Sequence, residues 1–104
     1  MKHLLDKLDK ALDNRIRLAI AALLTTDDKL DFTTLRDALE LTDGNLSSHL
    51  SALEKAGYLS VSKRFQARKP LTEYKLTKAG RLALARHLAA LEQLIQAQHN
   101  LTSP

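Results

Sequence analysis

The chain of 104 residues contains no cysteine and no tryptophan, and only 4% of its residues are aromatic. Without cysteine it can form neither a disulfide framework nor a thiolate metal site, and such a composition suits a reducing cytoplasm. The scarcity of aromatic rings counts against proteins that hold single-stranded nucleic acid by stacking its bases on exposed side chains. Disulfide-stapled scaffolds and base-stacking platforms are therefore disfavoured.

Long hydrophobic runs are also missing. The longest, Leu18 to Leu24, falls far short of the roughly 20 apolar residues that a membrane-spanning helix needs. Asp6 and Asp9 interrupt the region where the apolar stretch of a signal peptide would lie. We therefore expect a cytoplasmic protein with no membrane partner, folded as a single domain over residues 1–104, because a chain of this length supports one core.

Charged residues are distributed unevenly, although the net charge of +4 is mild. Residues 27–43 hold six acids and two bases, whereas residues 58–80 hold six bases and one acid. A run of like charge is usually a solvated face, and charge alone favours that interpretation. The basic stretch therefore indicates a binding surface only if its place in the fold supports one.

Hydrophobic spacing predicts a mainly α protein with a small β-hairpin, which is an α+β fold. Apolar residues recur at helical intervals up to Gly57, where the period changes from 3.6 to 2. The expected helices cover residues 4–12, 15–24, 33–39, 42–56 and 77–98, with a short strand at 30–32. The predicted helix N-caps are Asn14, Thr33 or Thr34, Thr42 and Thr77.

Two of these helices, residues 33–39 and 42–56, are joined by a tight turn and form a candidate helix-turn-helix over residues 33–56. The second helix buries a stripe of leucines, and its opposite face is small or polar, which suits close approach to base edges in a major groove. The predicted DNA contacts of this helix are Asp43, Gly44, Asn45, Ser47, Ser48, Ser51 and Lys55.

Gly44 is an unusual residue for a helix, where it costs up to about 1 kcal/mol relative to alanine. A requirement for close approach to DNA would explain the glycine. The alternative is that the whole face is merely solvated, which is the more common fate of a serine-rich helix face.

A basic hairpin follows Gly57, and we call it the wing, residues 58–76. Apolar and polar residues alternate on both of its arms, and a polar turn from Arg64 to Pro70 joins them. Long cations at a hairpin tip can reach phosphates or a minor groove. The predicted wing contacts are Lys63, Arg64, Arg68 and Lys69, with Arg15 and Arg17 near the start of the second helix as further backbone contacts.

The segment from Leu41 to Tyr58 resembles the recognition-helix signature of MarR/ArsR-like winged helix-turn-helix regulators. Its letters are Leu41-Thr42-Asp43-Gly44-Asn45-Leu46-Ser47-Ser48-His49-Leu50, continuing as Leu53-Glu54-Lys55-Ala56-Gly57-Tyr58. Arg64-Phe65, Pro70-Leu71-Thr72 and the run from Tyr74 to Gly80 resemble that family's wing and the start of its last helix.

The resemblance covers roughly residues 14–91. It implies a winged-helix fold, binding to double-stranded DNA as a homodimer, and a role in transcription, usually as a repressor. The sequence departs from the family at Arg15, where many relatives have a proline after the asparagine. It also lacks the cysteine motif of the metal-sensing ArsR proteins, so no metal response is implied.

Helices at both termini are expected to form a dimer interface, over residues 1–13 and 77–99. The 4-3-4 spacing of apolar residues on the last helix matches a helix–helix seam, and its apolar surface is wide enough for two partners. The predicted interface residues are Leu4, Leu5, Leu8, Leu84, Leu88, Leu91 and Ile95. The alternative is that the last helix folds back entirely on its own domain.

Metal binding and catalysis find little support. The four histidines, His3, His49, His87 and His99, form no paired ligand motif, so we expect no metal and no cofactor. Ser48 and His49 are adjacent on a helix and point about 100° apart, which does not suit a nucleophile and its base. We therefore expect that the protein is not an enzyme.

Two other functions remain open. A winged-helix module that binds protein instead of DNA would expose an apolar patch on its recognition face, which the residues of this helix do not supply. A small-molecule effector bound between the dimer helices and the DNA-binding core would make a regulator responsive, but no residue identifies such a ligand.

Overall fold

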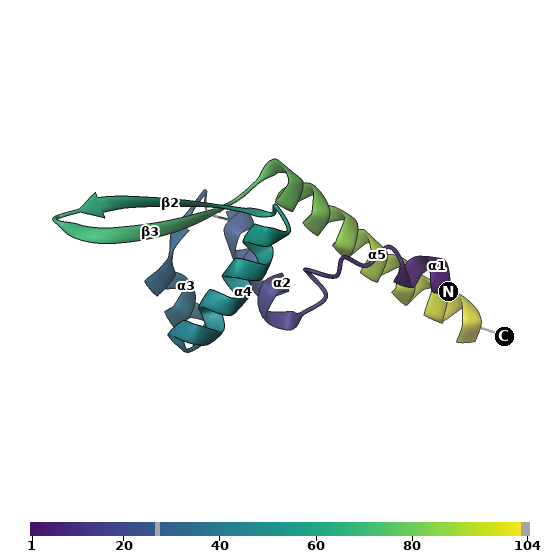
Figure 1. Ribbon diagram of the computed structural model, residues 1–104. Helices are drawn as coiled ribbons and strands as arrows, with labels where there is room; N and C mark the ends of the chain where they lie inside the picture. The colour runs from purple at the N-terminus through teal and green to yellow at the C-terminus, as the bar shows by residue number, and fades with distance from the viewer. Residues whose placement is uncertain (27, 103–104) are drawn as a thin grey trace.

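The computed structural model describes residues 1–26 and 28–102 and shows a helical body from which a long hairpin projects (Figure 1). The helices of these residues are α1 (Lys2–Leu5), α2 (Arg15–Thr26), α3 (Phe32–Leu39), α4 (Asp43–Lys55) and α5 (Lys78–Thr102). The strands are β1 (Leu30–Asp31), β2 (Leu59–Gln66) and β3 (Lys69–Leu76). The predicted mainly α fold with a small hairpin is confirmed; Asp27, which was placed in a charged run, lies outside the described residues.

The molecule is elongated, with principal extents of 64 × 26 × 21 Å. The wing projects from one end of the body, and α5 runs away from the other end beside α1 (Figure 1). No helix among the described residues combines the length and the hydropathy that crossing a membrane requires.

The strands form one antiparallel sheet in the order β1-β3-β2. The register of β2 and β3 runs from Leu59 opposite Leu76 to Gln66 opposite Lys69, so only two residues form the turn. The expected seven-residue turn was therefore wrong. Ala67 and Arg68 turn the chain with positive φ angles of 52° and 66°, the backbone of a tight hairpin turn that glycine or asparagine usually provides.

Pro70 lies inside β3 and not at a strand boundary. Proline removes a backbone donor, so within a sheet it is tolerated where the strand has an open edge. Strand β1 pairs with β3 only at Tyr74 and Glu73, which leaves the distal part of β3 open on that side. The proline is thus compatible with a hairpin that extends beyond the body.

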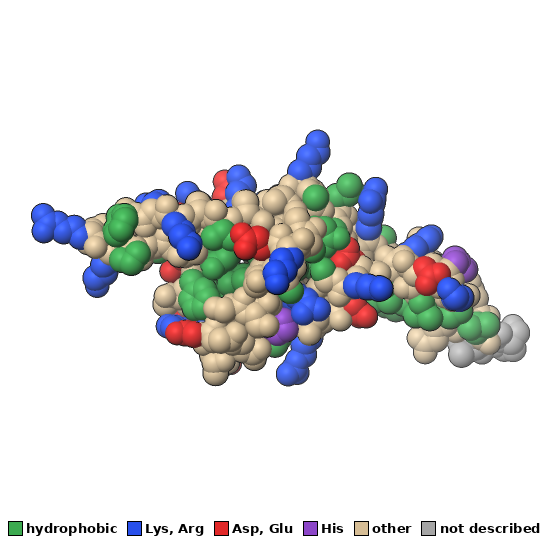
Figure 2. All heavy atoms as spheres, viewed as in Figure 1, with side chains coloured by type: hydrophobic (Ala, Val, Ile, Leu, Met, Phe, Trp, Pro, Cys, Tyr) green, Lys and Arg blue, Asp and Glu red, His purple; other side chains and the backbone are tan. Residues whose placement is uncertain are grey.

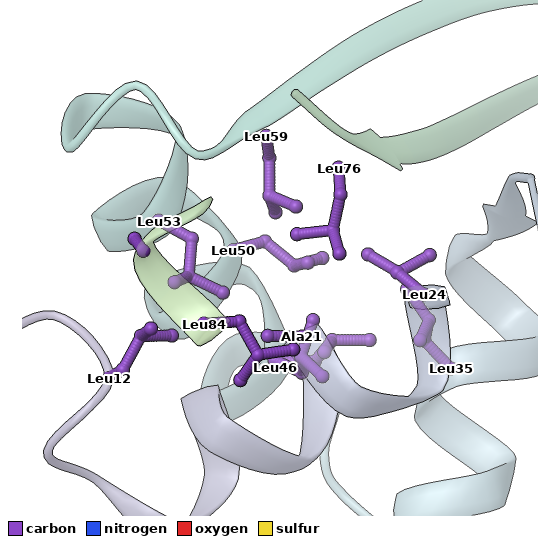
Figure 3. Close-up of a cluster of buried hydrophobic side chains, with 12 residues drawn as sticks. Leu12, Ala21, Leu24, Leu35, Leu46, Leu50, Leu53, Leu59, Leu76 and Leu84 are labelled. Carbon is purple, nitrogen blue, oxygen red and sulfur yellow. The ribbon is translucent and has the colours of Figure 1, made fainter. Parts of the chain in front are cut away.

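The hydrophobic core lies where α2, α3, α4, the base of the wing and the start of α5 meet (Figure 3). Leu46, Leu50 and Leu53 of α4 are buried in it, as their spacing predicted. Leu59 and Leu76 close the core from the wing (Figure 3). Each fully buried leucine contributes about 1.5–3 kcal/mol of hydrophobic stabilisation, so this cluster fixes the angle between α4 and the wing.

The predicted N-caps agree with the structure for three helices. The Thr42 hydroxyl accepts a hydrogen bond from the Asn45 amide at 3.1 Å, and the Thr77 hydroxyl accepts one from the Gly80 amide at 3.0 Å. The Asn14 side chain accepts from two amides at the start of α2. Gly57 has the positive φ of 83° expected of a residue that closes a helix.

Helix α3 differs from the prediction because it begins earlier, at Phe32, directly after β1. Asp31 is its N-cap residue, which makes the expected cap at Thr33 or Thr34 wrong. The Thr34 hydroxyl instead donates to the carboxylate of Asp31.

The N-terminal segment is not the continuous helix expected over residues 4–12. Helix α1 ends at Leu5, and Asp9 holds the following chain in a turn, because its carboxylate accepts from the Ala11 amide at 2.9 Å. The Asp9 amide donates to Nδ1 of buried His87 on α5 at 3.0 Å. An aspartate that binds nearby backbone in this way competes with helix, which explains the break.

The junction of α4, the wing and α5 is tightly packed around Gly80. The Thr77 amide donates to the Tyr58 carbonyl at 3.0 Å, and the Thr77 hydroxyl donates to the Gly57 carbonyl at 2.7 Å. A Cβ atom on Gly80 would collide with the Tyr58 carbonyl and lie 3.1 Å from a methyl carbon of Leu76. Glycine is thus required here by the close approach of two backbones.

Candidate nucleic-acid interface

Helix α4 presents two opposite faces. Its leucines point into the core, and the other side is open to solvent. The exposed residues include all seven that the sequence predicts to contact DNA, namely Asp43, Gly44, Asn45, Ser47, Ser48, Ser51 and Lys55. The structure therefore brings these residues together on one accessible helix, beside the wing.

Asp43 has a partner within the chain. Its carboxylate accepts from the Arg36 guanidinium of α3 at 2.8 Å, and Arg36 also pairs with Asp37 at 3.1 Å. The hydrogen bond that Arg36 donates to Asp43, followed by the one it donates to Asp37, raises the pKa of Arg36. The pair joins α3 to the first turn of α4 and offsets a negative charge that would otherwise face a phosphate backbone.

Gly44 is not required by any contact within the chain. A Cβ atom built on it would meet no other atom within 4 Å. Packing among the described residues therefore does not require glycine at this position, and close approach to DNA remains our prediction for it.

A groove of about 410 Å³ separates α4 from the wing. It is lined by Ser47, Leu50, Ser51, Glu54, Val61, Lys63 and Tyr74. Predicted contacts of the recognition helix and of the wing therefore share one surface. Burial, with a smaller contribution from Glu54, raises the pKa of Tyr74.

All four predicted wing cations, Lys63, Arg64, Arg68 and Lys69, are exposed. Figure 2 shows blue side chains around the far end of the wing, on both sides of a green apolar group. Because residues 62–70 are all exposed, this end of the hairpin is accessible to a large partner such as a duplex.

Arg64 behaves differently from the other wing cations. Its Nε atom donates to Glu73 on the neighbouring strand at 2.8 Å, and Lys29 lies 3.7 Å from the same oxygen. Glu73 is only 8% exposed, and the hydrogen bond from Arg64 holds the pKa of this carboxyl below its usual range against the opposing effect of desolvation. Arg64 thus links the two strands in the middle of the wing instead of extending from its tip.

Arg17 is also engaged within the chain. Its Nε atom donates to the Ala11 carbonyl at 2.5 Å, and its terminal nitrogen lies 3.2 Å from Nδ1 of His49 on α4. Burial, with a smaller effect of the Arg17 charge, lowers the pKa of His49. The structure therefore gives Arg17 an internal role as a link to α4, whereas Arg15 is exposed as expected.

The predicted dimer residues divide into three groups by their exposure. Leu84 is buried in the chain's own core, so its expected place in a dimer interface was wrong, and Leu4 is covered where α1 packs on α5. Leu5, Leu88 and Ile95 are exposed, Leu88 to 48% and Ile95 to 67%. The remaining predicted interface residues, Leu8 and Leu91, are half-buried.

Several residues of structural importance were not found from the sequence. Asp9 joins three elements, since the Tyr58 hydroxyl also donates to its carboxylate, and this hydrogen bond is the largest cause of the raised pKa of Tyr58. His87 and Glu73 are the buried polar partners in such links. These contacts join residues far apart in the chain, so the local spacing of residue types does not predict them. Within the described residues, no group of three or more potential metal ligands lies together.

Comparison with known proteins agrees with this geometry. Residues 16–95 match the family model described as the winged helix DNA-binding domain. An uncharacterised protein of Methanocaldococcus jannaschii is 34% identical over 85 residues, which cover 82% of this chain and 92% of that protein.

Solved structures give the same result. The transcriptional regulator homologue protein of Pyrococcus horikoshii OT3 superposes with a TM-score of 0.85 at 31% identity, covering 94% of this chain and 98% of that one. NadR in complex with 4-hydroxyphenylacetate has the same fold, with a TM-score of 0.68 at 22% identity over 99% of this chain and 72% of that one.

A recognition helix, a wing and their shared groove define a winged-helix DNA-binding protein of the transcriptional-regulator class. The chain belongs to the winged helix DNA-binding domain family. The resemblance to MarR/ArsR-like winged-helix regulators is confirmed.

Proposed function

We propose that this protein is a homodimeric repressor that binds a specific, pseudo-palindromic site on double-stranded DNA in the cytoplasm. The observation that carries the proposal is the groove in which Ser47 and Ser51 of α4 lie beside Lys63 of the wing, with Arg68 and Lys69 exposed at the end of the same hairpin. Asn45, Ser48 and Ser51 would read base edges in the major groove. The cations of the wing would hold the flanking phosphates.

The dimer follows from the apolar side chains that α5 leaves uncovered. Leu88 and Ile95 lie on the same side of the helix as Leu84, but they are 48% and 67% exposed, so among the described residues nothing covers them completely. A second copy packed against this side would bury both. Two-fold symmetry would set the recognition helices about 34 Å apart, which is one turn of DNA.

The dimer is tested by introducing charge on this side of α5. Leu88→Glu combined with Ile95→Glu should reduce the mass found by sedimentation equilibrium from that of a dimer to that of the 11.6 kDa chain, because charges cannot be buried unpaired between helices. Gln93→Glu, roughly on the opposite side of α5, serves as the control and should leave the mass unchanged. A double variant that remains dimeric would place the interface elsewhere.

DNA binding is tested with duplexes selected from a random library by the purified protein. Counterion release predicts that log affinity falls linearly with log salt concentration. A slope near zero would contradict the proposal and favour a protein-binding module, although the polar face of α4 offers no apolar patch for one. Repression itself requires that the selected site, placed over a promoter, blocks transcription in a purified system.

A small-molecule effector is supported by one observation. NadR, whose structure holds 4-hydroxyphenylacetate, has this fold. In our chain a groove of about 250 Å³ lies between the N-terminal segment and α5, lined by Lys7, Asp9, Tyr58, Ala79, Leu82, Ala83 and Arg86. We propose this groove as the place where an effector would act, because Asp9 connects it to both α5 and the base of the wing.

A further inference from the structure

The wing carries an apolar side chain that the protein does not cover. Phe65 is 75% exposed near the end of the hairpin, and its cross-strand partner is Pro70, also exposed. The chain has only two phenylalanines, and Phe32 packs against the core. The green group at the far end of the wing in Figure 2 is this apolar end of the hairpin.

The direction of Phe65 follows from the strand register. Side chains alternate between the two faces of a strand, so Phe65 shares its face with Val61 and Lys63. Those two residues line the groove between the wing and α4. Phe65 therefore lies on the face of the wing that turns toward the recognition helix, whereas Arg64, paired with Glu73, occupies the opposite face.

Positive charge surrounds this apolar end. Lys63 precedes Phe65 by two residues on the same face, and Arg68 sits in the turn with a positive φ of 66°. The two-residue turn requires this positive φ, and it places Arg68 at the end of the hairpin. Two wings packed against each other would bring their cations together, so the charge favours a polyanion as the partner.

We propose that Phe65 is an apolar wedge that enters the minor groove of bound DNA and packs between or against base steps, while Lys63 and Arg68 hold the adjacent phosphates. The inference rests on the proposed DNA binding and adds a mode of contact to it. Apolar wedges kink the duplex, and flexible pyrimidine–purine steps yield most easily, so such a step is expected beneath each wing.

The test uses the duplex selected by the wild-type protein, with 2-aminopurine at the steps beneath the wing and dyes at the two ends. Phe65→Ala should weaken binding roughly 100-fold, because losing one aromatic contact to a base usually costs about tenfold and a dimer loses two. It should also remove the rise in 2-aminopurine fluorescence and the bend seen by energy transfer. The salt slope should not change, because no charge is lost.

Two further variants complete the design. Phe65→Leu keeps an apolar side chain and should retain most of the affinity and the bend. Gln66→Ala changes the neighbouring exposed residue on the other face of β2 and should behave as the wild type. Phe65→Ala that binds and bends like Gln66→Ala would overturn the wedge while leaving DNA binding intact. Wild-type protein that shows no salt-dependent binding would overturn the proposed function itself.

Discussion

Replacing Lys63, Arg68 and Lys69 together by alanine is expected to weaken DNA binding by at least roughly 100-fold near physiological salt. These three cations are exposed at the free end of the wing and have no structural role in the core. A dimer would lose six phosphate contacts, so the slope of log affinity against log salt should fall by up to about 5. Titration of a labelled duplex at several salt concentrations measures both quantities.

The matched control removes the same charge from another surface. Lys75, Lys78 and Arg81 are exposed at the base of the wing and the start of α5, and their triple alanine variant has the same net charge. It should keep the wild-type slope. Equal losses in the two variants would mean that net charge, and not the wing, drives binding. Arg64→Ala is a different experiment, because it frees buried Glu73 from its partner and disturbs the wing itself.

Gly80→Ala is expected to destabilise the protein by about 1–3 kcal/mol, which lowers the melting temperature by roughly 5–20 °C for a domain of this size. Alanine favours helix over glycine by up to about 1 kcal/mol, so helix propensity alone predicts the opposite sign. The clash with the Tyr58 carbonyl should outweigh it, because that carbonyl is fixed by the Thr77 amide. Thermal unfolding followed by circular dichroism measures the change.

Gly44→Ala is the control, since it makes the same substitution in the first turn of another helix. The space around Gly44 is open, so the variant should be more stable than the wild type, by up to about 1 kcal/mol. If Gly44 faces DNA closely, the same variant should bind the selected duplex more weakly despite its greater stability. A melting temperature of Gly80→Ala at or above that of the wild type would contradict the packing argument.

The sequence alone predicted those features that depend on a residue and its near neighbours in the chain. Thr42 and Thr77 cap their helices, Gly57 closes α4, and the leucine stripe of α4 is buried. These features depend on neighbours within one or two turns, so spacing and residue type predict them. The order of recognition helix, glycine, strand, turn and strand followed from the same kind of signal.

Other features depend on contacts that no spacing reveals. The periodic leucines near the N-terminus predicted a helix, but Asp9 bonds to α5 and to Tyr58, and the helix ends. Arg17 and Arg64 are residues of the type that contacts DNA phosphates, but both bind within the chain. Arg17 donates to the Ala11 carbonyl, and Arg64 pairs with Glu73. The dimer seam on α5 stays a prediction, except that one end of it, Leu84, enters the core because the body extends that far.

The elongated outline of the chain has a consequence for how its mass is judged in solution. A compact chain of 104 residues has a radius of gyration of about 13 Å, whereas this one has 16.2 Å. The chain therefore has the frictional coefficient of a larger compact protein. A monomer would elute early from a gel-filtration column, near the volume expected for a compact dimer. Elution volume is thus a poor guide to the stoichiometry of this protein, and a method that weighs the particle is needed.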